Sequence, residues 1–123
     1  MAKILIVDDD AEITTLLEKI LSLAGFDITV VNDSTLAMET AESMKPDLFI
    51  LDLMMPQPNG FELCPMIRSN PTMLNTPIII STAMDNFDSK DIAYAAGAND
   101  YLAKPFNQEE LPQRINALLN TGE

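Results

Sequence analysis

Short apolar runs alternate along the chain with longer segments in which apolar residues recur every three or four positions. The short runs are typical of strands, and the longer segments are typical of amphipathic helices. Most of these strands are almost wholly apolar, as expected of parallel strands that helices cover on both faces, whereas the second alternates and indicates an edge. The pattern therefore predicts an α/β fold with a doubly wound parallel sheet and five helices. The five predicted strands lie at residues 3–7, 26–31, 47–51, 78–81 and 100–103.

The ends of the predicted helices carry recognisable residues. Gly25 and Gly97 are expected to end the first and fourth helices. Ser34 and Asn107 are expected to cap the N-termini of the second and fifth. The first helix is expected to bury one face made of Ile13, Leu16, Leu17, Ile20, Leu21 and Ala24.

The 123 residues match one domain of ordinary size, without internal repeats or low-complexity linkers, so residues 1–123 are predicted to form a single domain. No run approaches the roughly 18 consecutive apolar residues of a membrane span, which predicts a cytoplasmic protein. The chain has no histidine, which excludes Cys/His metal clusters and histidine catalysis. The single cysteine, Cys64, cannot form an internal disulfide and is expected to be a small buried hydrophobic residue.

The chain is strongly acidic, with 19 Asp and Glu against 7 Lys and Arg and a net charge of -12. Such a charge repels phosphate backbones and anionic membranes, so direct binding to nucleic acid or membrane is not expected. The acidic excess by itself indicates solubility rather than a partner. The positions of a few carboxylates are more informative.

Polar side chains follow the apolar strands where each strand ends. Taken singly, each has an ordinary structural explanation, such as a helix cap or a solvated surface residue. In a doubly wound sheet, however, the carboxyl ends of the strands meet at one edge, where active groups lie. That edge would collect Asp8, Asp9 and Asp10, then Asp52, then Ser81 and Thr82, and finally Lys104 and Pro105.

These residue types together favour phosphoryl chemistry. Clustered carboxylates repel one another and raise each other's pKa, so a cation is needed among them. Oxygen ligands alone favour Mg2+ over zinc or copper. An Asp carboxylate can attack phosphorus to give an aspartyl phosphate, while a Lys ammonium and a Thr hydroxyl stabilise the charge of the phosphoryl oxygens.

Five motifs occur in order over essentially the whole chain: Ile-Leu-Ile-Val-Asp-Asp-Asp (4–10), Pro-Asp-Leu-Phe-Ile-Leu-Asp-Leu-Met-Met-Pro (46–56), Ser-Thr-Ala (81–83), Gly-Ala-Asn-Asp-Tyr (97–101) and Lys-Pro-Phe (104–106). Together they resemble the receiver domains of two-component response regulators. The resemblance implies a flavodoxin-like sheet with strand order 2-1-3-4-5. It also implies a phosphorelay switch that accepts a phosphoryl group from a histidine kinase or a histidine phosphotransfer domain, with Mg2+ as cofactor.

By this resemblance, Asp52 is the phosphoacceptor, and Asp8 and Asp9 form the acidic pair that holds Mg2+. Asp9 is expected to be the more direct ligand of the pair, and Asp52 itself also belongs to the ligand set. The main-chain carbonyl of Met54 is implied as a further ligand. A switch of this kind is not a turnover enzyme, because its product is its own modified state.

The resemblance also assigns the other strand ends. Thr82 would hydrogen-bond a phosphoryl oxygen, Ala83 would leave room for it, and Lys104 would pair with it. The bond before Pro105 is expected to be cis, which would turn Lys104 inward. Thr82 and Tyr101 would form the switch that changes the surface of the fourth helix, fifth strand and fifth helix. That surface would contact an output partner or form a homodimer.

The chain departs from the family pattern at several positions. Asn59-Gly60 stands where many relatives carry Asp-Gly, and Asn tolerates the same turn. Pro65 and Pro112 fall inside the third and fifth helices, where each is expected to remove a backbone hydrogen bond and invite a bend. A bend at Pro112 would alter dimerisation or the choice of partner. Met84 lies two residues beyond Thr82 and offers no hydrogen bond to an attacking water; together with Met54, it predicts slow autodephosphorylation.

Three alternatives remain at this point. An aspartyl-phosphate phosphatase would normally need a second acid two residues after its nucleophile, where this chain has Met54, and a cap insertion that is lacking. A flavodoxin-like FMN binder would need a phosphate-cradling loop after the first strand, where three aspartates would repel the phosphate. A receiver-like interaction module that works without phosphorylation is the third alternative, against which the intact set of site residues argues.

Overall fold

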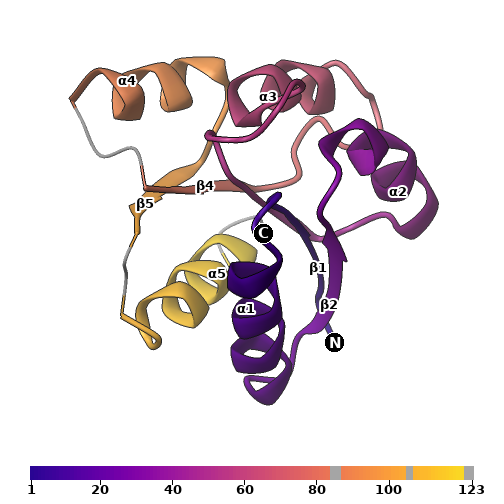
Figure 1. Cartoon of the computed structure of the whole chain (residues 1–123). Helices are drawn as coiled ribbons and strands as arrows, with labels where there is room; N and C mark the ends of the chain where they lie inside the picture. Colours follow the sequence, from indigo (N-terminus) through magenta and orange to yellow (C-terminus); the bar gives the residue numbers. More distant parts are fainter. Residues whose placement is uncertain (84–86, 105–106, 121–123) are drawn as a thin grey trace.

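The computed structural model describes residues 1–83, 87–104 and 107–120. Its centre is a five-stranded parallel sheet in the order β2-β1-β3-β4-β5 (Figure 1). This arrangement confirms the predicted doubly wound α/β fold, its strand order and β2 as an edge strand. The strands are β1 (Lys3–Val7), β2 (Asp27–Val31), β3 (Leu48–Leu51), β4 (Ile78–Thr82) and β5 (Asp100–Ala103).

Helices connect successive strands and cover the sheet on both faces. Figure 1 shows α2, α3 and α4 on one side of the sheet and α1 and α5 on the other. Among the described residues, no helix is long and apolar enough to cross a membrane. The helices are α1 (Ala11–Leu23), α2 (Ala37–Met44), α3 (Gly60–Arg68), α4 (Phe87–Ala96) and α5 (Glu110–Asn120), with a short 3-10 helix, Ser34–Leu36, before α2.

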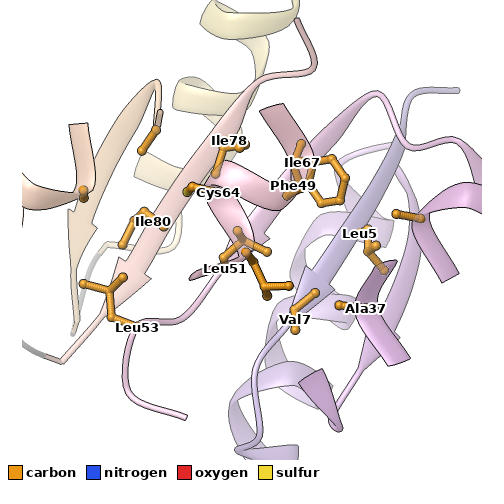
Figure 2. Packing of buried hydrophobic residues seen from close by; sticks show 14 of the residues in the cluster. Leu5, Val7, Ala37, Phe49, Leu51, Leu53, Cys64, Ile67, Ile78 and Ile80 are labelled. Carbon is orange, nitrogen blue, oxygen red and sulfur yellow. The ribbon is translucent and has the colours of Figure 1, made fainter. Parts of the chain in front are cut away.

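The sheet has two hydrophobic cores because successive strand residues point to opposite faces. We call the side covered by α2, α3 and α4 the α3 face, and the side covered by α1 and α5 the α1/α5 face. On the α3 face, Leu51 and Ile80 pack with Cys64 of α3, as Figure 2 shows. On the α1/α5 face, Ile50 and Ile79 belong to a cluster with Leu17, Leu21, Leu111 and Ile115 of the two helices.

The strand register brings the carboxyl ends of the central strands to one level. Val7 of β1 lies opposite Leu51 of β3, and Leu51 lies opposite Ile80 of β4. The ladder continues past the strand ends, since the Asp52 amide donates to the Val7 carbonyl at 3.1 Å and the Asp8 amide donates to Val31 at 3.1 Å. The first residues beyond β1 and β3 are therefore held side by side.

The predicted helix ends are confirmed at the glycines and wrong at Ser34. Gly25 and Gly97 follow α1 and α4 with φ of 98° and 120°, the left-handed conformation that favours glycine. Asp33, not Ser34, caps the 3-10 helix by accepting from the Thr35 amide. The Asn107 side chain accepts from the amide of Glu109, one residue before α5 begins.

The two prolines have different positions in their helices. Pro65 lies inside α3 as predicted. Pro112 is only the third residue of α5, where the amide has no partner within the helix in any case. The prediction that Pro112 removes a helical hydrogen bond is therefore wrong. Leu16, predicted on the buried face of α1, is 50% exposed and lines a groove of about 190 Å³ between α1 and α5.

Candidate functional site

Three carboxylates meet at the carboxyl edge of the sheet. Asp8 and Asp9 follow β1, and Asp52 follows β3. One carboxylate oxygen from each lies within 4.8 Å of the others, with Asp8 and Asp52 buried and Asp9 exposed. An oxygen-only donor set of this kind, open to solvent on one side, fits a Mg2+ ion that keeps some of its waters. The predicted group of acids is thus assembled in space.

Lys104, which follows the edge strand β5, extends its side chain to these carboxylates. The Lys104 Nζ atom lies 2.7 Å from Asp8 Oδ2 and 3.6 Å from Asp52 Oδ2. Its main-chain amide donates to the Thr82 carbonyl at 2.8 Å, which fixes the start of the side chain beside the end of β4. The ammonium is positioned to pair with an anion at Asp52, although its shorter contact in this structure is to Asp8.

The protonation of Asp8 reflects its burial. Removal from water raises the pKa of the Asp8 carboxyl above its ordinary value, and the nearby Asp52 carboxylate adds to the rise. Hydrogen bonds from Lys104 and from the Asp10 amide oppose this rise. Burial is the largest influence, so the charged form of Asp8 carries a net cost that a bound cation would relieve.

Asp10, the third aspartate of the run, has a different role. Its Oδ1 accepts from the amides of Glu12 and Ile13 at 3.0 and 3.3 Å, which makes it the N-cap of α1. Its own amide donates to Asp8 Oδ1 at 3.0 Å. The start of α1 therefore also orients the buried carboxylate.

The loop after β3 positions Asp52 through two contacts that the sequence did not predict. The Met54 amide donates to Asp52 Oδ1 at 3.1 Å. A Cβ atom built on Gly60 would lie 2.7 Å from the Asp52 carbonyl oxygen, so only glycine allows α3 to approach this closely. Asn59 caps α3 in a reciprocal arrangement with Glu62. The Asn-Gly pair is therefore a helix start packed against the site.

Side chains after β2 hydrogen-bond to the loop that carries Asp8 and to the loop that follows Asp52. The side-chain Nδ2 of Asn32 donates to the Asp8 main-chain carbonyl at 2.9 Å and to the Thr14 hydroxyl at 3.0 Å. The Ser34 hydroxyl donates to the Pro56 carbonyl at 3.0 Å, in the loop after Asp52. No local sequence pattern indicates Asn32 or Ser34 in this role, because the three bonds join residues 18 to 24 positions apart.

The two residues of the predicted switch lie on the neighbouring strands β4 and β5. Thr82 ends β4 and is fully buried. Tyr101 of β5 is also buried, and its hydroxyl forms a 2.9 Å hydrogen bond with the hydroxyl of Ser89 on α4. The ring already points into the molecule. The sequence does not indicate that Ser89 bonds with Tyr101, because that contact depends on how α4 packs on β5.

Several predicted positions contribute less to the described geometry. Ala83 is exposed just after β4. The expected cis bond before Pro105, and Met84, lie outside the described residues. Cys64 is fully buried, and burial raises the pKa of its thiol to about 11, in agreement with a small core residue.

Comparison with known proteins gives a coherent result. Residues 4–116 match the family described as response regulator receiver domain. The chain is 40% identical over 121 residues to the alkaline phosphatase synthesis transcriptional regulatory protein PhoP of Bacillus subtilis, covering 98% of this chain and 50% of PhoP. The chain thus spans about half the length of this curated relative.

Solved structures agree with the sequence matches. A putative response regulator from Chloroflexus aurantiacus superposes with a TM-score of 0.92 at 35% identity, covering 97% of this chain and 98% of that one. The BeF3-activated N-terminal receiver domain of Klebsiella pneumoniae RstA gives a TM-score of 0.89 at 32% identity, with 95% and 97% covered. The chain therefore belongs to the response regulator receiver domain family, whose members act as signalling switches in two-component systems.

Proposed function

We propose that this receiver domain is a phosphorylation switch whose acceptor is Asp52. The observation that carries the proposal is the meeting of Asp8, Asp9 and Asp52 with the Lys104 ammonium at one edge of the sheet. Acids alone would indicate no more than a cation site. A partly buried lysine within 3.6 Å of Asp52 adds a group that can neutralise a transferred phosphoryl group.

The transfer would need little from the protein beyond position and charge. An Asp52 carboxylate oxygen attacks phosphorus, the new O–P bond forms, and the P–N bond of a phosphohistidine donor breaks, leaving its histidine neutral after proton uptake. Lys104 pairs with the phosphoryl oxygens, and the Thr82 hydroxyl donates to one of them. The exposed Ala83 leaves room for the group. The donor would be a histidine kinase or a histidine phosphotransfer domain.

Mg2+ is the expected cofactor, because the donor set contains only hard oxygen atoms. Asp8, Asp9, Asp52 and the Met54 carbonyl would hold it, with Asp9 as the more direct ligand of the acidic pair. When bound, the ion supplies positive charge that offsets the repulsion among the carboxylates and stabilises the phosphoryl oxygens. The exposed Met54 side chain, 53% accessible at the mouth of the site, offers no hydrogen bond to water and supports slow autodephosphorylation.

The output would pass through α4, β5 and α5. A Thr82 hydroxyl drawn to the phosphoryl group would leave space beside Tyr101, which lies on the neighbouring strand. The existing bond between Tyr101 and Ser89 supports an inward position of the ring in this proposal. We expect the resulting surface to bind an output partner or a second copy of the domain.

The wider setting is also a proposal. Residues 1–123 would form one receiver domain working in the cytoplasm, and its net charge of -12 argues against direct contact with nucleic acid. PhoP is named as a transcriptional regulatory protein and is about twice as long as the matched region. A DNA-binding output would thus lie in a different segment or a separate partner.

The test is intact mass after incubation with acetyl phosphate and Mg2+, for the wild type and for Asp52→Asn, with an EDTA control. We expect the wild type to gain one phosphoryl group, and the variant and the EDTA sample to gain none. If no adduct forms, binding of beryllofluoride, a stable phosphoryl mimic, separates two explanations. Binding would indicate hydrolysis faster than the assay. Absence of binding by a folded, Mg2+-binding chain would overturn the proposal in favour of a module that works without phosphorylation.

A further inference from the structure

Ser81, next to the predicted switch residue Thr82, has an unexplained hydroxyl. The residue is only 2% exposed, and its Oγ has no hydrogen-bond partner within the described part of the chain. Buried hydroxyls are nearly always hydrogen-bonded, because leaving one unpaired costs the water contacts it lost on folding. An alanine here would fill almost the same space without that cost. The serine is therefore expected to have a partner in some other state of the molecule.

The strand pattern shows which way this hydroxyl points. Ile80 packs on the α3 face, and Ile79 packs on the α1/α5 face. Because side chains alternate along a strand, Ser81 shares the α1/α5 face with Ile79. The register that places Ile80 opposite Leu51 brings Ser81 beside Asp52. The unpaired hydroxyl is thus a lateral neighbour of the proposed phosphoacceptor.

Lys104 crosses the same part of the sheet. Ser81 lies opposite Leu102 of β5, and Lys104 follows two residues later on the same face. The lysine ammonium contacts Asp8 and Asp52, which follow β1 and β3, and β4 lies between β3 and β5. The side chain must therefore pass the end of β4, where Ser81 is located. An ammonium has three N–H donors, and Asp8 at 2.7 Å accepts one of them.

We propose that Ser81 is a positioning residue for Lys104, whose ammonium donates to the Ser81 hydroxyl oxygen once Asp52 carries a phosphoryl group. In the unmodified chain, the Lys104 Nζ atom lies 2.7 Å from Asp8 Oδ2 and 3.6 Å from Asp52 Oδ2, so Asp8 is its nearer partner. Pairing with a phosphoryl group on Asp52 draws the ammonium away from Asp8. Ser81 Oγ then replaces the lost acceptor and keeps the lysine aligned. This inference rests on the proposed function.

The test is a double-mutant cycle read by beryllofluoride binding. Wild type, Ser81→Ala, Lys104→Ala and the double variant are titrated with beryllofluoride at saturating Mg2+ in a calorimeter. We expect Ser81→Ala to weaken binding by about tenfold to a hundredfold, the usual loss for a hydrogen bond to a charged group. In the Lys104→Ala background the same substitution should change binding by less than about twofold, because its partner is absent. Ser81→Thr, which keeps a hydroxyl, should bind nearly as well as the wild type.

Two further measurements separate positioning from a structural defect. Ser81→Ala should be as stable to urea as the wild type or more stable, since it removes an unpaired buried hydroxyl. Its Mg2+ affinity should be unchanged, because Ser81 is not among the acids. Ser69→Ala, which removes an exposed hydroxyl at the C-terminal end of α3, serves as the matched control and should bind beryllofluoride and Mg2+ as the wild type does.

The outcomes are distinct. A Ser81→Ala chain that binds beryllofluoride as tightly as the wild type overturns the inference and leaves the proposed function intact. An equal loss in the presence and absence of Lys104 also overturns it, because the hydroxyl would then act independently of the lysine. A wild-type chain that binds Mg2+ but no beryllofluoride overturns the proposed function, and this inference with it.

Discussion

The two faces of the sheet end differently at the carboxyl edge. On the α1/α5 face, the row beyond the hydrophobic core contains Asp8, Asp52 and Lys104, which are charged and in mutual contact. On the α3 face, Thr82 ends β4 and Tyr101 lies on β5 opposite Ile80, and both are buried and uncharged. One face therefore concentrates charge, and the other places hydroxyl groups next to a large core.

This division follows from the period of a strand. Ser81 and Thr82 are adjacent in sequence but point to opposite faces, so one residue step separates the acidic site from the proposed switch. Charge on one face can change without burial of any ion in the α3-face core. If the division is functional, substitutions on the α1/α5 face should alter the chemistry, and substitutions on the α3 face should alter packing and conformation.

Lys104→Ala should produce the largest kinetic change apart from loss of Asp52 itself. Removing the ammonium leaves phosphoryl oxygens without their pairing charge, and we expect labelling by acetyl phosphate to slow by about 100-fold. Quenched-flow or intact-mass time courses at saturating Mg2+ measure this rate. Stability without Mg2+ should also fall, because the buried Asp8 and Asp52 carboxylates lose the ammonium that pairs with them. A wild-type labelling rate in Lys104→Ala would show that the charged face does not act as a unit.

Asp8→Asn should stabilise the metal-free protein while weakening Mg2+ binding. Burial raises the pKa of Asp8, so between the unfolded and the raised pKa the native state holds a proton that the unfolded state has released. In EDTA, this group's contribution to wild-type stability should thus fall as pH rises from about 3.9 through the raised pKa. The Asn side chain cannot ionise, so the variant avoids the cost of a buried charge and should be more stable than the wild type at pH 7 by about 1 kcal/mol.

Urea denaturation in EDTA from pH 4 to pH 7 measures the effect. The gap between variant and wild type should widen with pH, since only the wild type acquires the buried charge. The matched control is Asp9→Asn, which removes an exposed carboxylate of the same group and should change metal-free stability by less than about 0.5 kcal/mol. If Asp8→Asn were instead destabilising at pH 7, the bond with Lys104 would outweigh the cost of burial.

The sequence predicted the parts of this comparison that depend on strand order and spacing. The five strands could be located from apolar runs, and the meeting of Asp8, Asp52 and Lys104 followed because parallel strands share one carboxyl edge. The sequence did not reveal that Lys104 contacts Asp8 more closely than Asp52, because that depends on side-chain rotamers in a crowded site.

The sequence also did not predict the contacts that depend on how the helices pack on the sheet. The close approach of Gly60 to the Asp52 carbonyl and the bond between Ser89 and Tyr101 depend on how α3 and α4 lie on the sheet. Ser34 was assigned as a cap because serine is a common cap, yet its neighbour Asp33 has the longer acidic side chain and takes that place. Local preference could not decide between two adjacent candidates.

Ser89→Ala should give the smallest effect and is the sharpest test of the α3 face. Loss of the 2.9 Å bond leaves the Tyr101 hydroxyl with one partner fewer in a buried position, so we expect a stability loss of about 1 kcal/mol. Labelling by acetyl phosphate should stay within about twofold of the wild type, since no charged group of the site is touched. The Tyr101 ring should become more accessible to iodide quenching, measured in a Tyr94→Phe background because Tyr94 is partly exposed.

A cycle with Tyr101→Phe gives this prediction its control. Once the tyrosine hydroxyl is absent, Ser89→Ala should cost much less stability, because the two hydroxyls act as a pair. The wild-type bond would then account for the inward ring in the unmodified chain, and weakening it should shift the ring population without affecting the acids. If Ser89→Ala slowed labelling as strongly as Lys104→Ala, the two faces would be coupled in the chemical step itself, and the division drawn from strand alternation would describe only the geometry.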